Sequence, residues 1–153
     1  MTKAPINRIS RGDIDLIAVE CEHPQNALNL YQTIAITSAI YPGKGTPFGL
    51  MYAALGLAEA GEVQNKVKKA FRDDEMLDYQ SARADGSAGT VIFSKLSDER
   101  RAQIVKELGG VLWYVAAVCD EIGASMSEVA LQNLEELCSR GERGTLQGSG
   151  DDR

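Results

Sequence analysis

Helix start signals divide this chain into four segments, and they limit its fold more than any other feature of the sequence. In Thr46-Pro47, a capping residue precedes a proline, which suits the first position of a helix. Ser97 is followed by two acidic residues, and Ser125 and Glu128 have the spacing of a capping box. Apolar residues recur at helical spacing after each signal. The sequence therefore predicts helices over residues of about 24–40, 46–72, 97–122 and 125–141.

The connections between these helices are mostly shorter than the helices, which is typical of an α bundle. We therefore expect an all-α, four-helix bundle-like domain over residues 23–142. Residues 1–22 lack sustained helical periodicity and read as an N-terminal extension. Residues 73–96 contain Asp85-Gly86, which favours a long loop or a small hairpin. Residues 143–153 are too rich in glycine to be helical and form a predicted tail.

Composition argues against several classes of protein. A chain of 153 residues, 44% of them hydrophobic, suffices for one domain with its own core. The formal charge of −6 argues against binding to a nucleic acid polymer, which requires a basic surface. The three cysteines form no CxxC pair, the N-terminus lacks the pattern of a signal peptide, and no apolar stretch reaches the roughly 18 to 20 residues that span a bilayer. We expect a protein of the cytoplasm without a membrane partner.

Two acids and two lysines share one face of the second predicted helix. At about 100° per residue, Glu62 lies about 60° from Glu59 around the helix, Lys66 about 20° and Lys69 about 80°. Glutamate and lysine at this spacing are common on solvated helix faces, so the pattern alone carries little information. A second acidic helix changes the interpretation. Glu107 lies on an arc of apolar side chains, where a carboxylate is costly unless it is paired, protonated or metal-bound.

Two helices that each present carboxylates can bind a hard divalent cation, which takes oxygen ligands and leaves positions for phosphate oxygens and water. Lys66, Lys69 and Arg72 follow the acids of the second helix and can offset the charge of a phosphorylated substrate. The residues thus indicate metal-dependent chemistry on a phosphate compound.

An ordered series of motifs covers most of the chain from about residue 29 onward. Its members are Tyr31-Gln32, Tyr41-Pro42, Gly56–Val63, Lys106–Ala116, Arg143-Gly144-Thr145 and Gly148–Arg153. This series resembles the MazG-like family of all-α nucleoside triphosphate pyrophosphohydrolases. The resemblance implies a MazG-like all-α fold that is completed by a homodimer or homotetramer. It also implies Mg²⁺-dependent hydrolysis of a nucleoside triphosphate (NTP or dNTP) to the monophosphate and pyrophosphate, with Mn²⁺ as a substitute metal.

The resemblance also assigns the site residues. Carried over by position, Glu59, Glu62 and Glu107 are the metal-binding and catalytic carboxylates. Substrate contacts are implied for Lys66, Lys69, Arg72, Tyr114, Arg143 and Arg153.

The chain departs from the family pattern, EExxE followed by ExxD, at two positions. Ala58 replaces the first acid of EExxE, which is a variable position, and Gly110 replaces the aspartate of ExxD. The glycine removes a metal ligand and destabilises a helix by roughly 1 kcal/mol relative to alanine. Three interpretations follow: a natural enzyme with weakened or altered metal binding, a relative that binds nucleotide without turnover, or a protein disabled by substitution.

Overall fold

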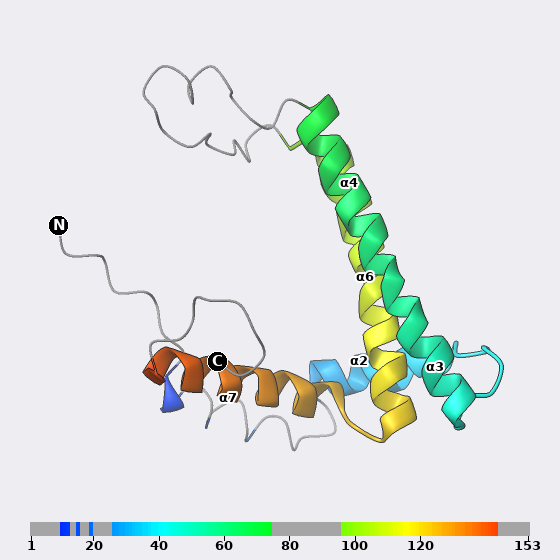
Figure 1. Cartoon of the computed structure of the whole chain (residues 1–153), viewed down its shortest axis with the longest axis vertical. Helices are drawn as coiled ribbons and strands as arrows, with labels where there is room; N and C mark the ends of the chain where they lie inside the picture. Colours follow the sequence, from blue (N-terminus) through cyan, green and yellow to red (C-terminus); the bar gives the residue numbers. More distant parts are fainter. Residues whose placement is uncertain (1–9, 13–14, 16–18, 20–25, 75–95, 144–153) are drawn as a thin grey trace. The chain divides into compact units, whose positions relative to one another are not determined.

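The structure is a computed structural model of the 153-residue chain, and it describes residues 10–12, 15, 19, 26–74 and 96–143 (Figure 1). Within these ranges no strand occurs, so the all-α prediction is confirmed for this part of the chain. The elements in chain order are α2 (Ala27–Ile36), α3 (Pro47–Gly56), the 3-10 helix η1 (Leu57–Glu59), α4 (Ala60–Asp73), α6 (Asp98–Ile122) and α7 (Met126–Arg143). Most of the predicted extension, nearly all of the predicted loop or hairpin over 73–96, and the tail after Arg143 lie outside the described residues.

The second predicted helix is divided by a single 3-10 turn. α3 begins with Pro47, as predicted, and Thr46 has the extended backbone of a capping residue. The Thr46 hydroxyl nevertheless donates to the Gly43 carbonyl oxygen at 2.6 Å and does not cap the helix, which corrects that part of the prediction. Glu59 is the last residue of η1, the turn between α3 and α4. Side chains three residues apart eclipse each other in a 3-10 turn, so Glu59 lies in line with Gly56.

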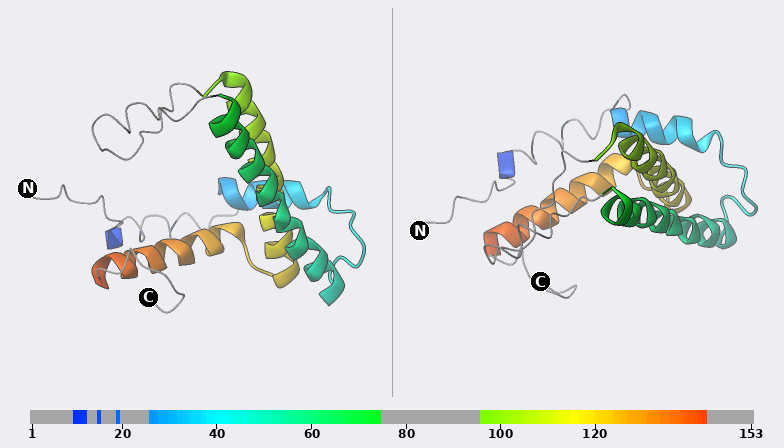
Figure 2. Two further views of the ribbon diagram at one scale, coloured as in Figure 1. Left: turned by 45° about the horizontal axis from the view of Figure 1, so that its top comes forward. Right: turned by 90° about the horizontal axis from the view of Figure 1, so that it is seen from above.

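The residues from Tyr41 to Val118 form one compact unit, here called the hairpin unit. In it, α4 and α6 lie side by side and run in opposite directions (Figure 1 and Figure 2). The buried side chains of α3, α4 and α6 in this unit are alanines, which permit close approach of the helix axes. They are Ala53, Ala70, Ala116 and Ala117. The order of cross-helix neighbours confirms the antiparallel register. Along α3, η1 and α4 the neighbours on α6 are Tyr114 for Gly56, Gly110 for Glu59, Glu107 for Lys66 and Arg100 for Asp74.

The second compact unit combines Met1–Ile40 with Cys119–Arg153 and is called the terminal unit. Its described residues include α2 and α7, whose N-termini are both capped. The Asn26 carboxamide accepts from the Leu28 amide at 2.9 Å, at the start of α2. At the start of α7, the Glu128 amide donates to Ser125 Oγ at 3.0 Å and the Ser125 amide donates to the Glu128 carboxylate at 3.3 Å. The predicted capping box is therefore confirmed.

The side chain of Gln32 joins α2 to the turn that precedes α7. Its amide nitrogen donates to the Ala124 carbonyl oxygen at 3.0 Å, and its amide oxygen accepts from the Met126 amide at 2.8 Å. Ser127, which is buried, donates its hydroxyl to Asn26 Oδ1 at 2.9 Å. Backbone N–H groups at the start of a helix need hydrogen-bond partners when they are shielded from water. The segment of α2 and its cap supplies such partners at the start of α7.

Two sequence predictions need correction. α2 ends at Ile36 rather than near residue 40, because the hydroxyls of Thr37 and Ser38 donate to carbonyl oxygens three residues earlier and compete with helix continuation. α6 is long and apolar enough to cross a membrane by length and composition alone, although no such stretch was expected. Core helices of water-soluble proteins meet the same criterion.

Candidate functional site

The candidate site lies on the hairpin unit, where Glu59 faces α6. A Cβ atom added to Gly110 would lie 3.4 Å from Glu59 Oε2 and 3.8 Å from Glu59 Cδ. The Glu59 carboxylate therefore lies directly in front of Gly110. Glu107 precedes Gly110 by three residues on α6, and residues at this spacing share a helix face. The hairpin register thus brings Glu59 to the face of α6 that carries Glu107.

Glu107 is paired with a lysine of α4. The Nζ atom of Lys66 lies 3.5 Å from Glu107 Oε1, and the two side chains are 24% and 19% exposed, respectively. A carboxylate that is shielded to this degree destabilises the fold unless a counter-charge accompanies it. Glu107 was expected to be paired, protonated or metal-bound, and in this structure it forms an ion pair with Lys66.

Glu62 does not join these groups. It is exposed and lines a shallow surface depression together with Gly61, Gln64, Asn65 and Lys68. Within the described ranges, no three His, Cys, Asp or Glu side chains are close enough together to hold a metal ion. The structure therefore brings Glu59 to Gly110 and Glu107 to Lys66, whereas Glu62 lines a surface depression that contains neither of these contacts.

Glu59 and Glu107 are the carboxylates of this site that could bind a hard divalent cation shared with a substrate. Mg²⁺ in nucleotide enzymes is usually bound through one or two carboxylates, with phosphate oxygens and water as its other ligands. Glu59 and Glu107 can supply these carboxylates from two helices. Gly110 carries no side chain, so this position adds no ligand of its own beside the Glu59 carboxylate.

Lys69 and Arg72 continue along α4 away from Glu59. Arg72 is 13 residues from Glu59, which corresponds to roughly 20 Å of helix. Its guanidinium donates to Asp73 at 2.5 and 2.9 Å, and these hydrogen bonds raise the pKa of Arg72 and lower the pKa of Asp73. Lys69 is half-buried, one turn beyond Lys66. Of the three predicted phosphate contacts on α4, Lys66 is the one placed at a candidate carboxylate.

An ion pair joins the two helices at the end of the hairpin far from Glu59. Arg100 donates to the Asp74 carboxylate through Nε at 2.9 Å and Nη2 at 3.2 Å. Both side chains are mostly shielded, and the hydrogen bonds hold the pKa of Asp74 below its ordinary value. This pair closes the hairpin next to the segment that was predicted to form a loop. It has a structural role that the sequence pattern did not indicate.

Aromatic rings gather at the Glu59 end of the hairpin unit. Tyr114 packs directly on Gly56, since an added Cβ there would lie 2.0 Å from Tyr114 Cε1. The Tyr114 ring also meets Trp113 edge-on, with ring centroids 4.9 Å apart. Trp113 in turn meets Tyr41 edge-on at 6.2 Å, and Tyr41 stacks on Tyr52 at 5.4 Å. Tyr114, a predicted nucleotide contact, therefore belongs to a packed cluster one turn from Glu59.

The two arginines predicted to contact substrate from the C-terminal region are placed differently. Arg143 is the last residue of α7, where its guanidinium donates to the Ser139 hydroxyl and lies 3.9 Å from the Glu136 carboxylate. Arg143 is thus helical, although residues 143–153 were predicted to form a tail. Arg153 lies outside the described residues.

Besides the Arg100–Asp74 pair, sequence reasoning missed two contacts of the hairpin unit. Gly56 was not identified as the position where α3 meets Tyr114, although a glycine within a helical pattern is a signal for close packing. The pairing of Lys66 with Glu107 was also missed, because a pattern along one helix does not show which residues of another helix it meets.

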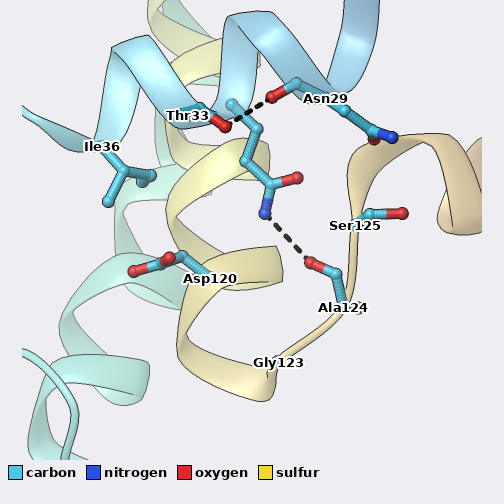
Figure 3. A pocket seen from close by; sticks show the side chains of 8 residues that line it. Asn29, Thr33, Ile36, Asp120, Gly123, Ala124 and Ser125 are labelled. Carbon is cyan, nitrogen blue, oxygen red and sulfur yellow. Dashed lines mark hydrogen bonds between the residues drawn. The ribbon is translucent and has the colours of Figure 1, made fainter. Parts of the chain in front are cut away.

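The terminal unit contains a separate polar hollow of about 530 Å³ (Figure 3). Asp120 of α6 faces it, together with Asn29 and Thr33 of α2 and the turn from Gly123 to Ser125. Gln32 lines the hollow and is engaged in the two hydrogen bonds that hold this turn. The hollow therefore borders a structural contact and contains none of the predicted site residues.

The chain is similar to Gene 37 protein of Mycobacterium phage L5. The two are 38% identical over 130 residues, which span 82% of this chain and 98% of the phage protein. No family model matches the chain, and no solved structure matches it.

Proposed function

We propose that this chain, which belongs to the family of Gene 37 protein of Mycobacterium phage L5, is a Mg²⁺-dependent nucleoside triphosphate pyrophosphohydrolase with a MazG-like fold. The name of the relative assigns no chemistry, so the proposal rests on the residues. The observation that carries it is the juxtaposition across the hairpin: the Glu59 carboxylate faces Gly110, on the surface of α6 that also carries Glu107. Two carboxylates from two helices on one face are the ligands expected for a divalent cation bound to phosphates.

The proposed metal ligands are Glu59 and Glu107, with the exposed Glu62 of α4 as a third carboxylate. Bound Mg²⁺, or Mn²⁺ in its place, would neutralise the triphosphate and polarise its α-phosphorus. A carboxylate of the site orients the attacking water and accepts its proton. The water oxygen bonds to the α-phosphorus while the bond from that phosphorus to the bridging oxygen breaks. The products are the nucleoside monophosphate and pyrophosphate.

The remaining residues of the site bind and position the substrate. Lys66 and Lys69 lie on the helix that follows Glu59 and offset phosphate charge. Tyr114 lies one turn from the Glu59–Gly110 contact, at a place where an aromatic side chain can contact the nucleoside. Arg72, Arg143 and Arg153 remain proposed phosphate contacts. Arg72 would have to exchange its hydrogen bonds with Asp73 for such a contact.

Gly110 favours one alternative, a protein of the same fold that binds nucleotide without turnover. A carboxylate at this position would lie beside Glu59, and its absence leaves the site with fewer ligands and less negative charge. Incubating the chain with each NTP and dNTP in Mg²⁺ or Mn²⁺ distinguishes the two functions. Formation of monophosphate and pyrophosphate would support the enzyme if Glu107→Gln abolishes it and Lys68→Met retains it. Nucleotide binding without pyrophosphate supports the alternative.

We further propose that the fold is completed by a homodimer or homotetramer. Large apolar side chains follow each other at helical spacing on two exposed helix faces. They are Phe48, Met51, Tyr52 and Leu55 on α3, and Val105, Leu108 and Leu112 on α6. Contiguous apolar surface of this kind marks association sites in water-soluble proteins. Light scattering should report a mass of at least two chains, and Leu108→Asp should reduce it. A monomer at micromolar concentration would contradict this proposal.

A further inference from the structure

Lys66 lies where it would compete with a divalent cation for the carboxylate of Glu107. Lys66 is paired with Glu107 at 3.5 Å, and Glu107 is also a proposed metal ligand. Both side chains are about three-quarters or more shielded from solvent, so their mutual attraction is screened less than that of an exposed pair. A divalent cation that approaches Glu107 therefore meets the positive charge of Lys66.

The other cations of α4 do not share this position. Lys68 is exposed and lines the depression beside Glu62, on another side of the helix. Arg72 is engaged by Asp73. Within residues 26–74 and 96–143, Lys66 is the cation that forms an ion pair with a proposed metal ligand. Its ammonium is a compact charge on a flexible stem of four carbons, so it can move between nearby anions without a change of the backbone.

We infer that Lys66 is an exchangeable counter-ion that couples cation binding to triphosphate binding. This inference rests on the proposed function. Without substrate, Lys66 neutralises Glu107 and opposes binding of a divalent cation. When a triphosphate arrives, the ammonium moves to a phosphate oxygen and releases Glu107 for the cation. The two ligands then bind cooperatively, and each raises the affinity for the other by the same factor.

The variant Lys66→Met tests this inference through two affinities that move in opposite directions. Titration calorimetry on the full chain measures Mn²⁺ binding without nucleotide, and separately measures binding of an α,β-methylene triphosphate analogue in EDTA. Removal of one unit charge at this distance should tighten Mn²⁺ binding about tenfold. The same change should weaken binding of the metal-free analogue several-fold, because a phosphate partner is lost.

Control variants separate this role from a structural one. Lys68→Met, on the same helix, should leave both affinities within about twofold of the natural chain. Lys66→Arg retains the charge and should resemble the natural chain in Mn²⁺ binding. Lys66→Gln gives a second neutral side chain for the case that methionine perturbs folding, which circular dichroism would reveal.

The outcomes distinguish failure of this inference from failure of the proposed function. Unchanged Mn²⁺ affinity in Lys66→Met and Lys66→Gln, or a fall in both affinities together, would overturn the exchange while leaving the enzyme proposal intact. If the natural chain and all its variants bind neither Mn²⁺ nor the analogue, alone or together, both the inference and the proposed function are wrong.

Discussion

The substitution Gly56→Ala tests the helix register on which the candidate site depends. The added Cβ would lie 2.0, 2.1 and 2.5 Å from three carbons of the Tyr114 ring, whereas ordinary contacts begin at 3.4 Å. The ring is also held edge-on by Trp113. The helices or the ring must therefore move apart by more than 1 Å. Overpacking of this kind destabilises by about 1–3 kcal/mol, and alanine returns about 1 kcal/mol through its helix propensity.

We expect Gly56→Ala to lower the free energy of unfolding by up to about 2 kcal/mol, and the melting temperature by up to ~8 °C for a chain of this size. Urea and thermal unfolding followed by circular dichroism measure both quantities. Gly61→Ala and Gly109→Ala are matched controls, because an added Cβ at either position meets nothing within 4 Å. Each control should stabilise the chain by up to about 1 kcal/mol.

A double-mutant cycle identifies the cause of the effect. In a Tyr114→Ala background the clash is gone, so Gly56→Ala should become neutral or stabilising. If Gly56→Ala stabilises the chain as much as the two control variants do, or if Tyr114→Ala does not relieve its effect, then Gly56 does not face Tyr114. The same result would remove the basis for placing Glu59 opposite Gly110, which lies one turn further along the hairpin.

Three further predictions concern the site and its surroundings. Gly110→Asp should raise the rate of Mg²⁺-dependent hydrolysis by orders of magnitude. It should also lower the melting temperature in EDTA, because the new carboxylate would lie against Glu59. An unchanged rate would show that Gly110 does not limit hydrolysis. Arg100 lowers the folded-state pKa of Asp74, so this pair stabilises the fold above the unfolded pKa of about 3.9 and loses its effect as the pH falls through the lower folded value. The stability gap between the natural chain and Asp74→Asn, measured by urea unfolding, should therefore shrink below about pH 4, and a constant gap would contradict the pairing. Burial raises the pKa of the Cys119 thiol, so this cysteine should react with iodoacetamide far more slowly in the folded than in the urea-unfolded chain; equal rates, resolved by peptide mass spectrometry, would contradict its burial.

The sequence predicted the helices well because their signals are local. Pro47 starts α3, and Ser125 and Glu128 form the capping box of α7. The end of α2 was predicted wrongly because side-chain hydroxyls there bond to the backbone. The hydroxyls of Thr37 and Ser38 bond to backbone carbonyl oxygens at the end of α2. Such competition depends on backbone geometry that apolar periodicity does not reveal.

The site was predicted in part, because its residues are related across helices. Glu59 and Glu107 were identified from acids on two helices, and the structure brings their helices together. The partner of Glu107 could not be predicted, since the antiparallel register that pairs it with Lys66 depends on packing. The 3-10 turn at Leu57–Glu59 was also not predicted, because a uniform angle of about 100° per residue assumes an uninterrupted α-helix. This turn aligns Glu59 with Gly56.

The fate of the water oxygen tests the central claim most directly. Hydrolysis of a nucleoside triphosphate by the natural chain in oxygen-18 water with Mg²⁺, followed by mass spectrometry of the products, locates the phosphorus that is attacked. Attack at the α-phosphorus predicts label in the nucleoside monophosphate and none in pyrophosphate, with Glu59→Gln abolishing the reaction. Label in orthophosphate or pyrophosphate, or hydrolysis that persists in Glu59→Gln, would contradict the account.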